Sequence, residues 1–169
     1  MTSHGHRHQT VSSLGCAVVT VSDTRTAAGD TSGARIAEML TAAGHAVRRR
    51  DIVTDDPERI RGCLEALLED PEIRAVVCTG GTGLAPRDVT IEVVRPLLEK
   101  EIPGFGELFR HLSFGEIGAA AMLSRATAGV VRERVLIALP GSTAAVTLAM
   151  ERLVLPTLGH MVFLAAGAS

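Results

Sequence analysis

Three polar segments each follow a run of apolar residues, and they carry the side chains that could do chemistry. They are Ser22-Asp23, Thr79-Gly80-Gly81-Thr82-Gly83 and Pro140-Gly141-Ser142. If the apolar runs are strands of a parallel sheet, all three segments lie at carboxyl ends of strands, where open α/β sheets bind their ligands. We therefore predict that the fold brings these residues together around one ligand.

The central segment, Thr79 to Gly83, is the most informative. Its three glycines permit a tight turn and a close approach of the backbone to a ligand. Free backbone N–H groups there, with the hydroxyls of Thr79 and Thr82, could hold a phosphate. The segment is not a dinucleotide fingerprint, because Pro86 stands where that motif needs a further glycine. Phosphate binding and a plain strand-to-helix turn both explain the glycines.

Two aspartates follow predicted strands at the same edge. Asp88 lies in Arg87-Asp88-Val89-Thr90, close behind the glycines, and Asp55 follows the second strand. A carboxylate beside a bound phosphate could hold Mg²⁺. Helix capping is the alternative, with Asp88 capping a helix that begins near Val89. At the second strand, capping suits Asp56 better than Asp55. After the first strand, Asp30-Thr-Ser-Gly33 supplies capping residues for the helix that follows.

Composition excludes several other kinds of function. The only lysine is Lys100, so the Gly-Lys-Ser/Thr of a P-loop is absent. No nucleophile triad and no zinc-ligand spacing is present. A net charge of −2, aromatic residues at 2% and the absence of Trp and Tyr argue against nucleic-acid or membrane-surface binding.

Size and patterning predict a polar tail over residues 1–13 and a single domain over residues 14–169. The tail carries His4, His6 and His8, which could bind Ni²⁺ or Cu²⁺ or simply belong to a frayed end. No signal peptide is evident, and no apolar run is long enough to span a bilayer. The apolar segment Leu153 to Ala166 is short and predicts a buried C-terminal helix.

The cysteines favour a reducing compartment. Cys16, Cys63 and Cys78 are odd in number and form no Cys-x-x-Cys pair, so we expect no disulfide framework and a cytoplasmic location. Cys16 and Cys78 lie in apolar runs, which predicts small buried core residues rather than catalytic thiols.

Strand and helix patterns alternate along the chain. We predict strands at 16–23, 46–53, 73–79, 126–131 and 134–139, and helices at 34–43, 59–69, 88–98, 105–111, 143–154 and 153–166. Three consecutive arginines indicate that the strand at 46–53 lies closer to an edge of the sheet, and Pro103-Gly104 predicts a turn. The state of residues 116–123 is left open. This alternation predicts an α/β domain with a mostly parallel sheet covered by helices on both faces.

The residues quoted so far resemble one known family. Thr79-Gly-Gly-Thr-Gly83 followed by Arg87-Asp88-Val-Thr90 is similar to the molybdopterin-binding family that includes MogA, MoaB and the gephyrin G domain. The resemblance extends over roughly residues 16–164. Further matching segments are Val21-Ser-Asp23, Asp30-Thr-Ser-Gly33, Ile102-Pro-Gly-Phe-Gly-Glu107 and Pro140-Gly141. The segments Ser113-Phe-Gly-Glu-Ile-Gly118, Leu123-Ser-Arg-Ala126 and Pro140-Gly-Ser-Thr143 most resemble the MoaB branch.

The resemblance implies a three-layer α/β/α sandwich and a homo-oligomer, either a trimer or a hexamer. It also implies adenylylation of molybdopterin with MgATP, in which the terminal phosphate of the pterin attacks the α-phosphorus and pyrophosphate leaves. By position, Asp55 and Asp88 resemble the two aspartates on which that activity depends, and they would hold Mg²⁺. Asp88 lies in a matching motif, whereas Asp55 follows Thr54 where the family often has proline.

The remaining residues of the site would position the phosphates. The segment from Thr79 to Gly83 would hold phosphate, while Ser22 and Pro140-Gly141-Ser142 would line the opposite wall. Either Arg87 or Arg125 could offset the developing charge. A non-catalytic molybdopterin carrier and a general nucleotide-binding module are the alternatives to the enzyme, and the choice between molybdenum and tungsten stays open.

Overall fold

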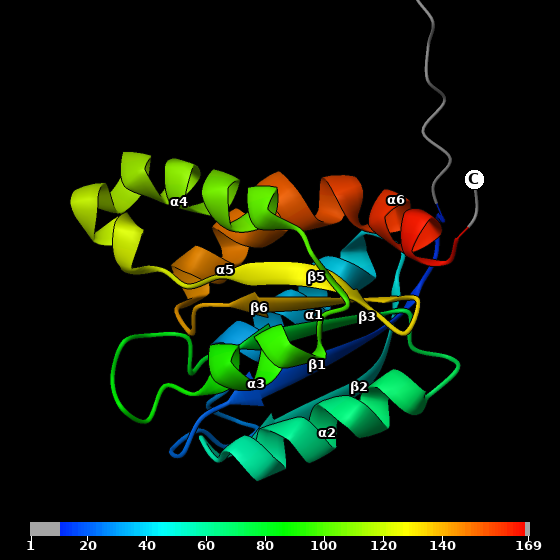
Figure 1. The fold of residues 1–169 in the computed structure, drawn as a ribbon, viewed down its shortest axis with the longest axis horizontal. Helices are drawn as coiled ribbons and strands as arrows, with labels where there is room; N and C mark the ends of the chain where they lie inside the picture. The colour runs from blue at the N-terminus through cyan, green and yellow to red at the C-terminus, as the bar shows by residue number, and fades with distance from the viewer. Residues whose placement is uncertain (1–10, 168–169) are drawn as a thin grey trace, which may run out of the picture.

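Six strands form one sheet in the order β2-β1-β3-β6-β5-β4 (Figure 1). The structure is a computed structural model that describes residues 11–167, so His4, His6 and His8 lie outside the described residues. Strands β2, β1, β3 and β6 run parallel, whereas β5 is antiparallel to β6 and β4 is antiparallel to β5. The strands span Gly15–Val21 (β1), Ala46–Val53 (β2), Ala75–Thr79 (β3), Lys100–Glu101 (β4), Thr127–Val131 (β5) and Arg134–Leu139 (β6).

The centre of the sheet is apolar because both of its faces are covered. Every residue of β3 is buried, and so are all but the first residue of β1 and of β6. Such continuous β-branched runs are typical of parallel strands between two helical layers. Strand β2 lies at the edge and exposes Arg48, Arg49 and Arg50, in agreement with the expectation from its charges.

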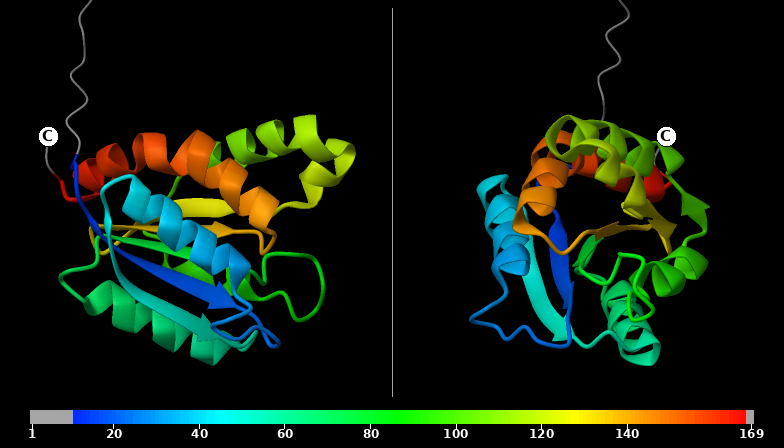
Figure 2. Two further views of the ribbon diagram at one scale, coloured as in Figure 1. Left: turned by 180° about the vertical axis from the view of Figure 1, so that it is seen from behind. Right: turned by 90° about the vertical axis from the view of Figure 1, so that its left-hand side faces the viewer.

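Helices cover both faces of the sheet (Figure 2). Alternate strand residues, such as Val18, Val77 and Ile137, pack in one core with α1 (Thr31–Ala42), α4 (Pro103–Ile117), α5 (Thr143–Ala149) and α6 (Leu155–Ala165). Their neighbours, such as Val19 and Val76, pack in a second core with α2 (Pro57–Glu69) and α3 (Thr90–Leu97). The predicted α/β/α arrangement with a mostly parallel sheet is therefore confirmed.

The helix starts agree with the predicted capping residues at two positions and disagree at a third. Asp30 caps α1 by accepting from Gly33 N, and Asp56 caps α2 by accepting from Arg59 N. Asp88 does not cap a helix, because α3 has Val89 at its N-cap position and no side-chain cap hydrogen bond. The capping explanation of Asp88 is wrong, which leaves its carboxylate to another role.

One helical segment is longer than predicted, and two predicted helices are joined into one. Helix α4 begins at Pro103, where we expected a turn, and continues to Ile117 before a 3-10 segment, η1 (Gly118–Leu123). Proline suits the first helical turn because that position needs no N–H donor. At the other end of the chain, α5, a π-helical segment at Met150–Val154 (η2) and α6 follow one another without a break.

This continuous C-terminal helix, Thr143–Ala165, corrects our expectation about apolar length. It has 23 residues and is long and apolar enough, by length and composition alone, to cross a membrane. In this fold it is a core helix, because Met150, Val154 and Leu158 are buried against the sheet. Its other face is only partly buried, so the segment is buried on one side of the helix and not throughout, as the prediction of a buried helix implied.

Candidate functional site

The carboxyl ends of β1, β2, β3 and β6 meet at one edge of the sheet, at the left in Figure 1. The loop after β1 is joined to the end of β2, because Asp55 N donates to Asp23 Oδ1 over 3.0 Å. The loops after β3 and β6 are joined by a 2.8 Å bond from Thr79 Oγ1 to the carbonyl of Pro140. The structure thus brings the three predicted polar segments together, as parallel strand directions require.

The turn Gly80–Gly83 needs glycine for reasons of packing. Gly80 has φ +97°, and a Cβ there would overlap the carbonyl oxygen of Val21. Gly81 has φ +62°, and a Cβ there would overlap Thr90 Oγ1 and lie 2.8 Å from Asp55 Oδ1. L side chains are strained at such positive φ values. Both the backbone conformation and the lack of space therefore exclude larger residues.

The same turn keeps backbone donors available. Among the described residues, none accepts a hydrogen bond from the N–H groups of Gly81, Thr82 or Gly83. Successive free N–H groups in a turn of this kind attract anions. The Thr79 hydroxyl, by contrast, donates its proton to Pro140, so it could act on a ligand only as an acceptor.

Two cavities adjoin the turn, one on each side. The first, about 410 Å³, is lined by charged residues, among them Asp23, Arg25, Asp55 and Arg87. The second, about 430 Å³, is more apolar. Its lining includes Thr82, Gly83, Phe109, Ile117, Leu123, Pro140 and Ala145. Both cavities share Gly80, Gly81, Asp88, Gly141 and Ser142, so Asp88 lies where the two meet.

The carboxylates of the first cavity repel one another. Burial raises the pKa of Asp55, and the neighbouring charges of Asp23 and Asp88 raise it further, while Arg87 opposes them. A divalent cation would relieve this repulsion. Within residues 11–167, no group of three or more His, Cys, Asp or Glu side chains could hold a metal ion by itself. Two carboxylates completed by substrate phosphates would suit Mg²⁺, which rarely takes an all-protein cage.

The two candidate arginines have different surroundings. Arg87 lines the first cavity and acts electrostatically on Asp55. Arg125 is bound to the carbonyl groups of Thr82, Gly83 and Asp88 and to the carboxylate of Glu92. Its charge is therefore already compensated, and only Arg87 of the pair is placed to offset charge on a substrate.

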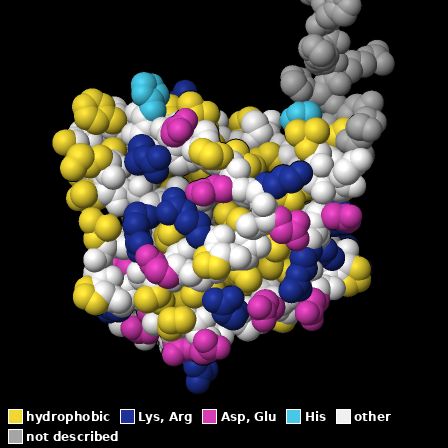
Figure 3. All heavy atoms as spheres, in the orientation of Figure 1, with side chains coloured by type: hydrophobic (Ala, Val, Ile, Leu, Met, Phe, Trp, Pro, Cys, Tyr) yellow, Lys and Arg dark blue, Asp and Glu magenta, His cyan; other side chains and the backbone are white. Residues whose placement is uncertain are grey.

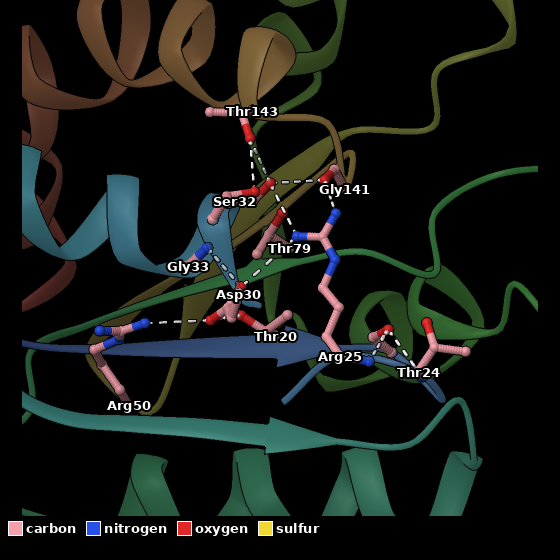
Figure 4. A network of polar contacts seen from close by, with 12 residues as sticks. Thr20, Thr24, Arg25, Asp30, Ser32, Gly33, Arg50, Thr79, Gly141 and Thr143 are labelled. Carbon is pink, nitrogen blue, oxygen red and sulfur yellow. Dashed lines mark hydrogen bonds and ion pairs between the residues drawn. The ribbon is translucent and has the colours of Figure 1, made fainter. Parts of the chain in front are cut away.

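A polar network missed by the sequence analysis supports the wall of the first cavity (Figure 4). The buried carboxylate of Asp30 accepts from the Thr20 hydroxyl and lies 3.8 Å from the Arg25 guanidinium. Arg25 and Ser32 both donate to the carbonyl of Gly141. The capping pattern after Asp30 was visible in the sequence, but the bond from Arg25 to the carbonyl of Gly141 spans 116 residues and gives no local signal.

The predicted serines have structural partners as well. Ser22 Oγ accepts from the backbone of Thr24 and Arg25, and Ser142 Oγ accepts from Ala145 N as the cap of α5. Both line the first cavity, so a role in ligand binding stays a prediction. The cysteines behave as core residues: burial raises the pKa of Cys16 and of Cys78 to about 12.

Comparison with known proteins assigns the chain and its fold to one family. The chain matches the family described as "Probable molybdopterin binding domain" over residues 17–160. It is 48% identical to molybdenum cofactor biosynthesis protein B of Bacillus cereus and 45% identical to that of Bacillus subtilis, with 94% and 96% of both chains covered.

Solved structures agree with the sequence comparison. A crystal structure of molybdenum cofactor biosynthesis protein B has a TM-score of 0.89 at 48% identity, covering 93% of this chain and 98% of the other. The tungsten cofactor synthesizing protein MoaB of Pyrococcus furiosus has a TM-score of 0.79 at 40% identity, covering 91% and 98%. With its α/β/α fold and its glycine turn between two cavities, the chain belongs to the MoaB/MogA family of molybdopterin-binding proteins.

Proposed function

We propose that this protein acts in molybdenum cofactor biosynthesis by adenylylating molybdopterin with MgATP. One observation carries the proposal: the carboxylate of Asp88 lies between a charged cavity and a more apolar one. A reaction between two ligands needs such a shared boundary, because their reacting groups must meet beside the group that neutralises their charge. The curated relatives act in the same cofactor pathway by name, which supports the assignment.

The two cavities suit different parts of the ligands. Charged walls with Asp55, Arg87 and Arg25 suit phosphates and their cation, while the walls formed by Phe109 and Ile117 suit a heterocyclic ring. The terminal phosphate of molybdopterin would attack the α-phosphorus of ATP, forming one P–O bond while the bond to pyrophosphate breaks. The attacking group is already an anion near neutral pH, so no general base is required.

The residues of this chain would then act by position and charge. Asp55 and Asp88 would hold Mg²⁺, which neutralises charge on the phosphates when bound. Free N–H groups of Gly81 to Gly83 would hold phosphate oxygens, and Arg87 would offset the charge that develops on the leaving group. Ser22, with Gly141 and Ser142 on the far wall, would limit where the phosphates can lie.

The decisive test is AMP transfer by the purified protein mixed with molybdopterin, ATP and Mg²⁺, with chromatography to detect adenylylated molybdopterin. Asp88→Asn should abolish product while it keeps the fold, because an amide oxygen can still accept from Ala85 N as Asp88 Oδ2 does now. Asp56→Asn is the matched control: Asp56 caps α2 outside the cavity, and asparagine caps equally well. Full activity in Asp88→Asn would remove that residue from the mechanism.

A non-catalytic carrier is the second candidate, since the apolar cavity alone could bind a pterin. It predicts tight molybdopterin binding with no product, and the same affinity in Asp88→Asn as in the unaltered protein. ATP binding that requires Mg²⁺ and weakens in Asp88→Asn would favour the enzyme over the carrier. The same assay therefore separates the two candidates.

We also propose a homo-oligomer, a trimer or a hexamer, in the cytoplasm. Large apolar side chains gather over the end of α4 and over η1, at the upper left of Figure 3. Phe114, Ile117, Met122 and Leu123 are all exposed there, and a surface of this kind favours protein contacts. Sedimentation equilibrium would give the number of subunits, and a monomer at micromolar concentration would contradict the proposal.

A further inference from the structure

The guanidinium of Arg125 donates hydrogen bonds to carbonyl groups of one loop, residues 82–88, which we call the Asp88 loop. Its Nε donates to the carbonyl of Thr82 over 3.1 Å. Its Nη2 donates to the carbonyls of Gly83 and Asp88 over 2.7 and 2.9 Å. Arg125 thus holds both ends of the Asp88 loop from a point about forty residues further along the chain.

The chemistry of this contact requires arginine. A guanidinium presents several N–H donors in one plane and fixed directions, so it can serve separate carbonyl groups at once. An ammonium is a compact charge on a flexible stem and cannot reproduce this pattern. Glu92 pairs with the outer side of the same guanidinium, and this hydrogen bond lowers the pKa of Glu92. The pair leaves Arg125 no free charge for a substrate.

Held carbonyl groups fix the direction of the neighbouring N–H groups. In a trans peptide the C=O and the following N–H point to opposite sides of the chain. The bonds to the carbonyls of Thr82 and Gly83 therefore turn the N–H groups of Gly83 and Leu84 away from Arg125. The side chain of Asp88 closes the loop from within, since its Oδ2 accepts from Ala85 N over 2.9 Å.

Few other contacts hold this loop. Residues 83–87 are exposed, and their backbone belongs to no helix or strand. Exposed segments with little buried surface open at low free-energy cost, so a few hydrogen bonds decide their conformation. The loop nevertheless carries Asp88, the carboxylate at the boundary of the two cavities.

We propose that Arg125 is a positioning residue for catalysis: its guanidinium holds the Asp88 loop in the conformation that presents the Asp88 carboxylate to the metal-bound phosphates. The inference rests on the proposed AMP transfer for its effect on rate. Its effect on loop order and on metal affinity does not depend on that activity, so the two can be tested apart.

The test compares Arg125→Lys with Arg95→Lys, a matched control. Arg95 is an exposed arginine of α3 whose one ion pair within residues 11–167 is with Glu101, and lysine keeps its charge. The test follows amide exchange at Ala85 and Asp88, because theirs are the N–H groups of the Asp88 loop for which the described residues supply an acceptor. Exchange at these two amides should become about tenfold faster in Arg125→Lys, while exchange in the sheet is unchanged. Mn²⁺ affinity in the presence of ATP, measured by electron paramagnetic resonance, should weaken by about fivefold, because one carboxylate is no longer held in place. Arg95→Lys should match the unaltered protein in both measurements.

Activity supplies a further readout. The kcat for AMP transfer should fall by about 100-fold in Arg125→Lys, as a misplacement near 1 Å can cause, while the KM for molybdopterin stays within about twofold. In Arg125→Ala, added guanidinium ion at millimolar concentration should restore part of the rate, and sodium or ammonium ion should not. An arginine with a merely structural role would show neither this fall in kcat at nearly constant KM nor this recovery with guanidinium ion.

Two results would overturn the inference. One is unchanged amide exchange at Ala85 and Asp88 in Arg125→Lys; the other is faster exchange there with unchanged Mn²⁺ affinity. If the unaltered protein transfers no AMP, the proposed function fails, and the exchange and Mn²⁺ measurements still decide the role of Arg125. If Arg125→Ala loses its native sheet, Arg125→Lys still carries the test, since it retains the charge opposite Glu92.

Discussion

Two arginines hold the loops at the carboxyl edge of the sheet, and they differ in the acid with which each is paired. Arg25 lies beside Asp30, whose side chain is only 3% exposed. Arg125 pairs with Glu92, whose side chain is 56% exposed. Both arginines donate to backbone carbonyl groups of a loop that lines a cavity, so their local geometry is similar.

The difference in burial gives the two pairs different physical roles. A buried carboxylate that loses its hydrogen bonds costs several kcal/mol. The loop held at Asp30 should therefore stay ordered as long as the whole domain is folded. An exposed pair is solvated when it opens and contributes little to stability. We therefore expect the Arg25 side of the site to open only with global unfolding and the Arg125 side to open locally.

Removal of the buried acid, Asp30, should give the largest change in the free energy of unfolding. Asp30→Ala leaves the Thr20 hydroxyl without its acceptor, removes the cap of α1 and separates Arg25 and Arg50 from their partner. We expect a loss of about 3 kcal/mol in the free energy of unfolding, measured by urea denaturation. Asp30→Asn should lose less, because its amide oxygen can still accept from Gly33 N. A loss below about 1 kcal/mol in Asp30→Ala would show that the buried acid is not what distinguishes the two sides.

A substitution outside both loops that stabilises the fold should also separate the Arg25 side of the site from the Arg125 side. Arg132 and Glu133 form the β5–β6 turn with φ of 47° and 60°, values that asparagine and glycine adopt more readily. The double change Arg132→Asn and Glu133→Gly should raise the free energy of unfolding by about 1 kcal/mol. Amide exchange at Ser22 and Arg25, whose N–H groups donate to the carbonyl of Val53 and to Ser22 Oγ, should then slow with the domain, while exchange at Ala85 and Asp88 should not. Equal slowing of both loops would contradict the proposed difference.

Neutralising the exposed acid should give the smallest effect on stability. Glu92→Gln should lower the free energy of unfolding by about 0.5 kcal/mol at neutral pH and leave AMP transfer close to normal, because the carbonyl contacts of Arg125 remain. A loss of several kcal/mol would place the Arg125 pair in the same class as Asp30.

The same acid predicts the direction of a pH effect. The hydrogen bond from Arg125 holds the pKa of Glu92 below its ordinary value of 4.5. An acid with a lowered pKa stabilises the fold above its unfolded pKa, and this contribution is lost as the pH falls through the folded value. Amide exchange of the Asp88 loop should therefore accelerate below about pH 4.5 relative to the sheet. In Glu92→Gln this acceleration should be absent; its persistence would assign the effect to another group.

Local sequence signals predicted most elements correctly and failed at particular residues. Capping by Asp30 and Asp56 was readable because each side chain acts within three residues of its own position. Asp88 looked like a cap for the same reason, but its carboxylate turns back to Ala85 instead. The pattern at Pro103 predicts a turn, yet helix α4 begins at this residue, because proline suits both a turn and the first turn of a helix.

The sequence by itself determined the alternation of strands and helices, the glycine turn and the family, since these depend on periodicity and on motifs within a few residues. Only the tertiary structure decided which arginine is free: Arg87 faces the first cavity, while Arg125 is held by carbonyl groups about forty residues away. It also decided that Asp55 and Asp88 flank one glycine turn, with their charges close enough to interact. Such pairings arise from the strand directions: the parallel strands end at this edge of the sheet, and the antiparallel strand β5 begins there, just after Arg125.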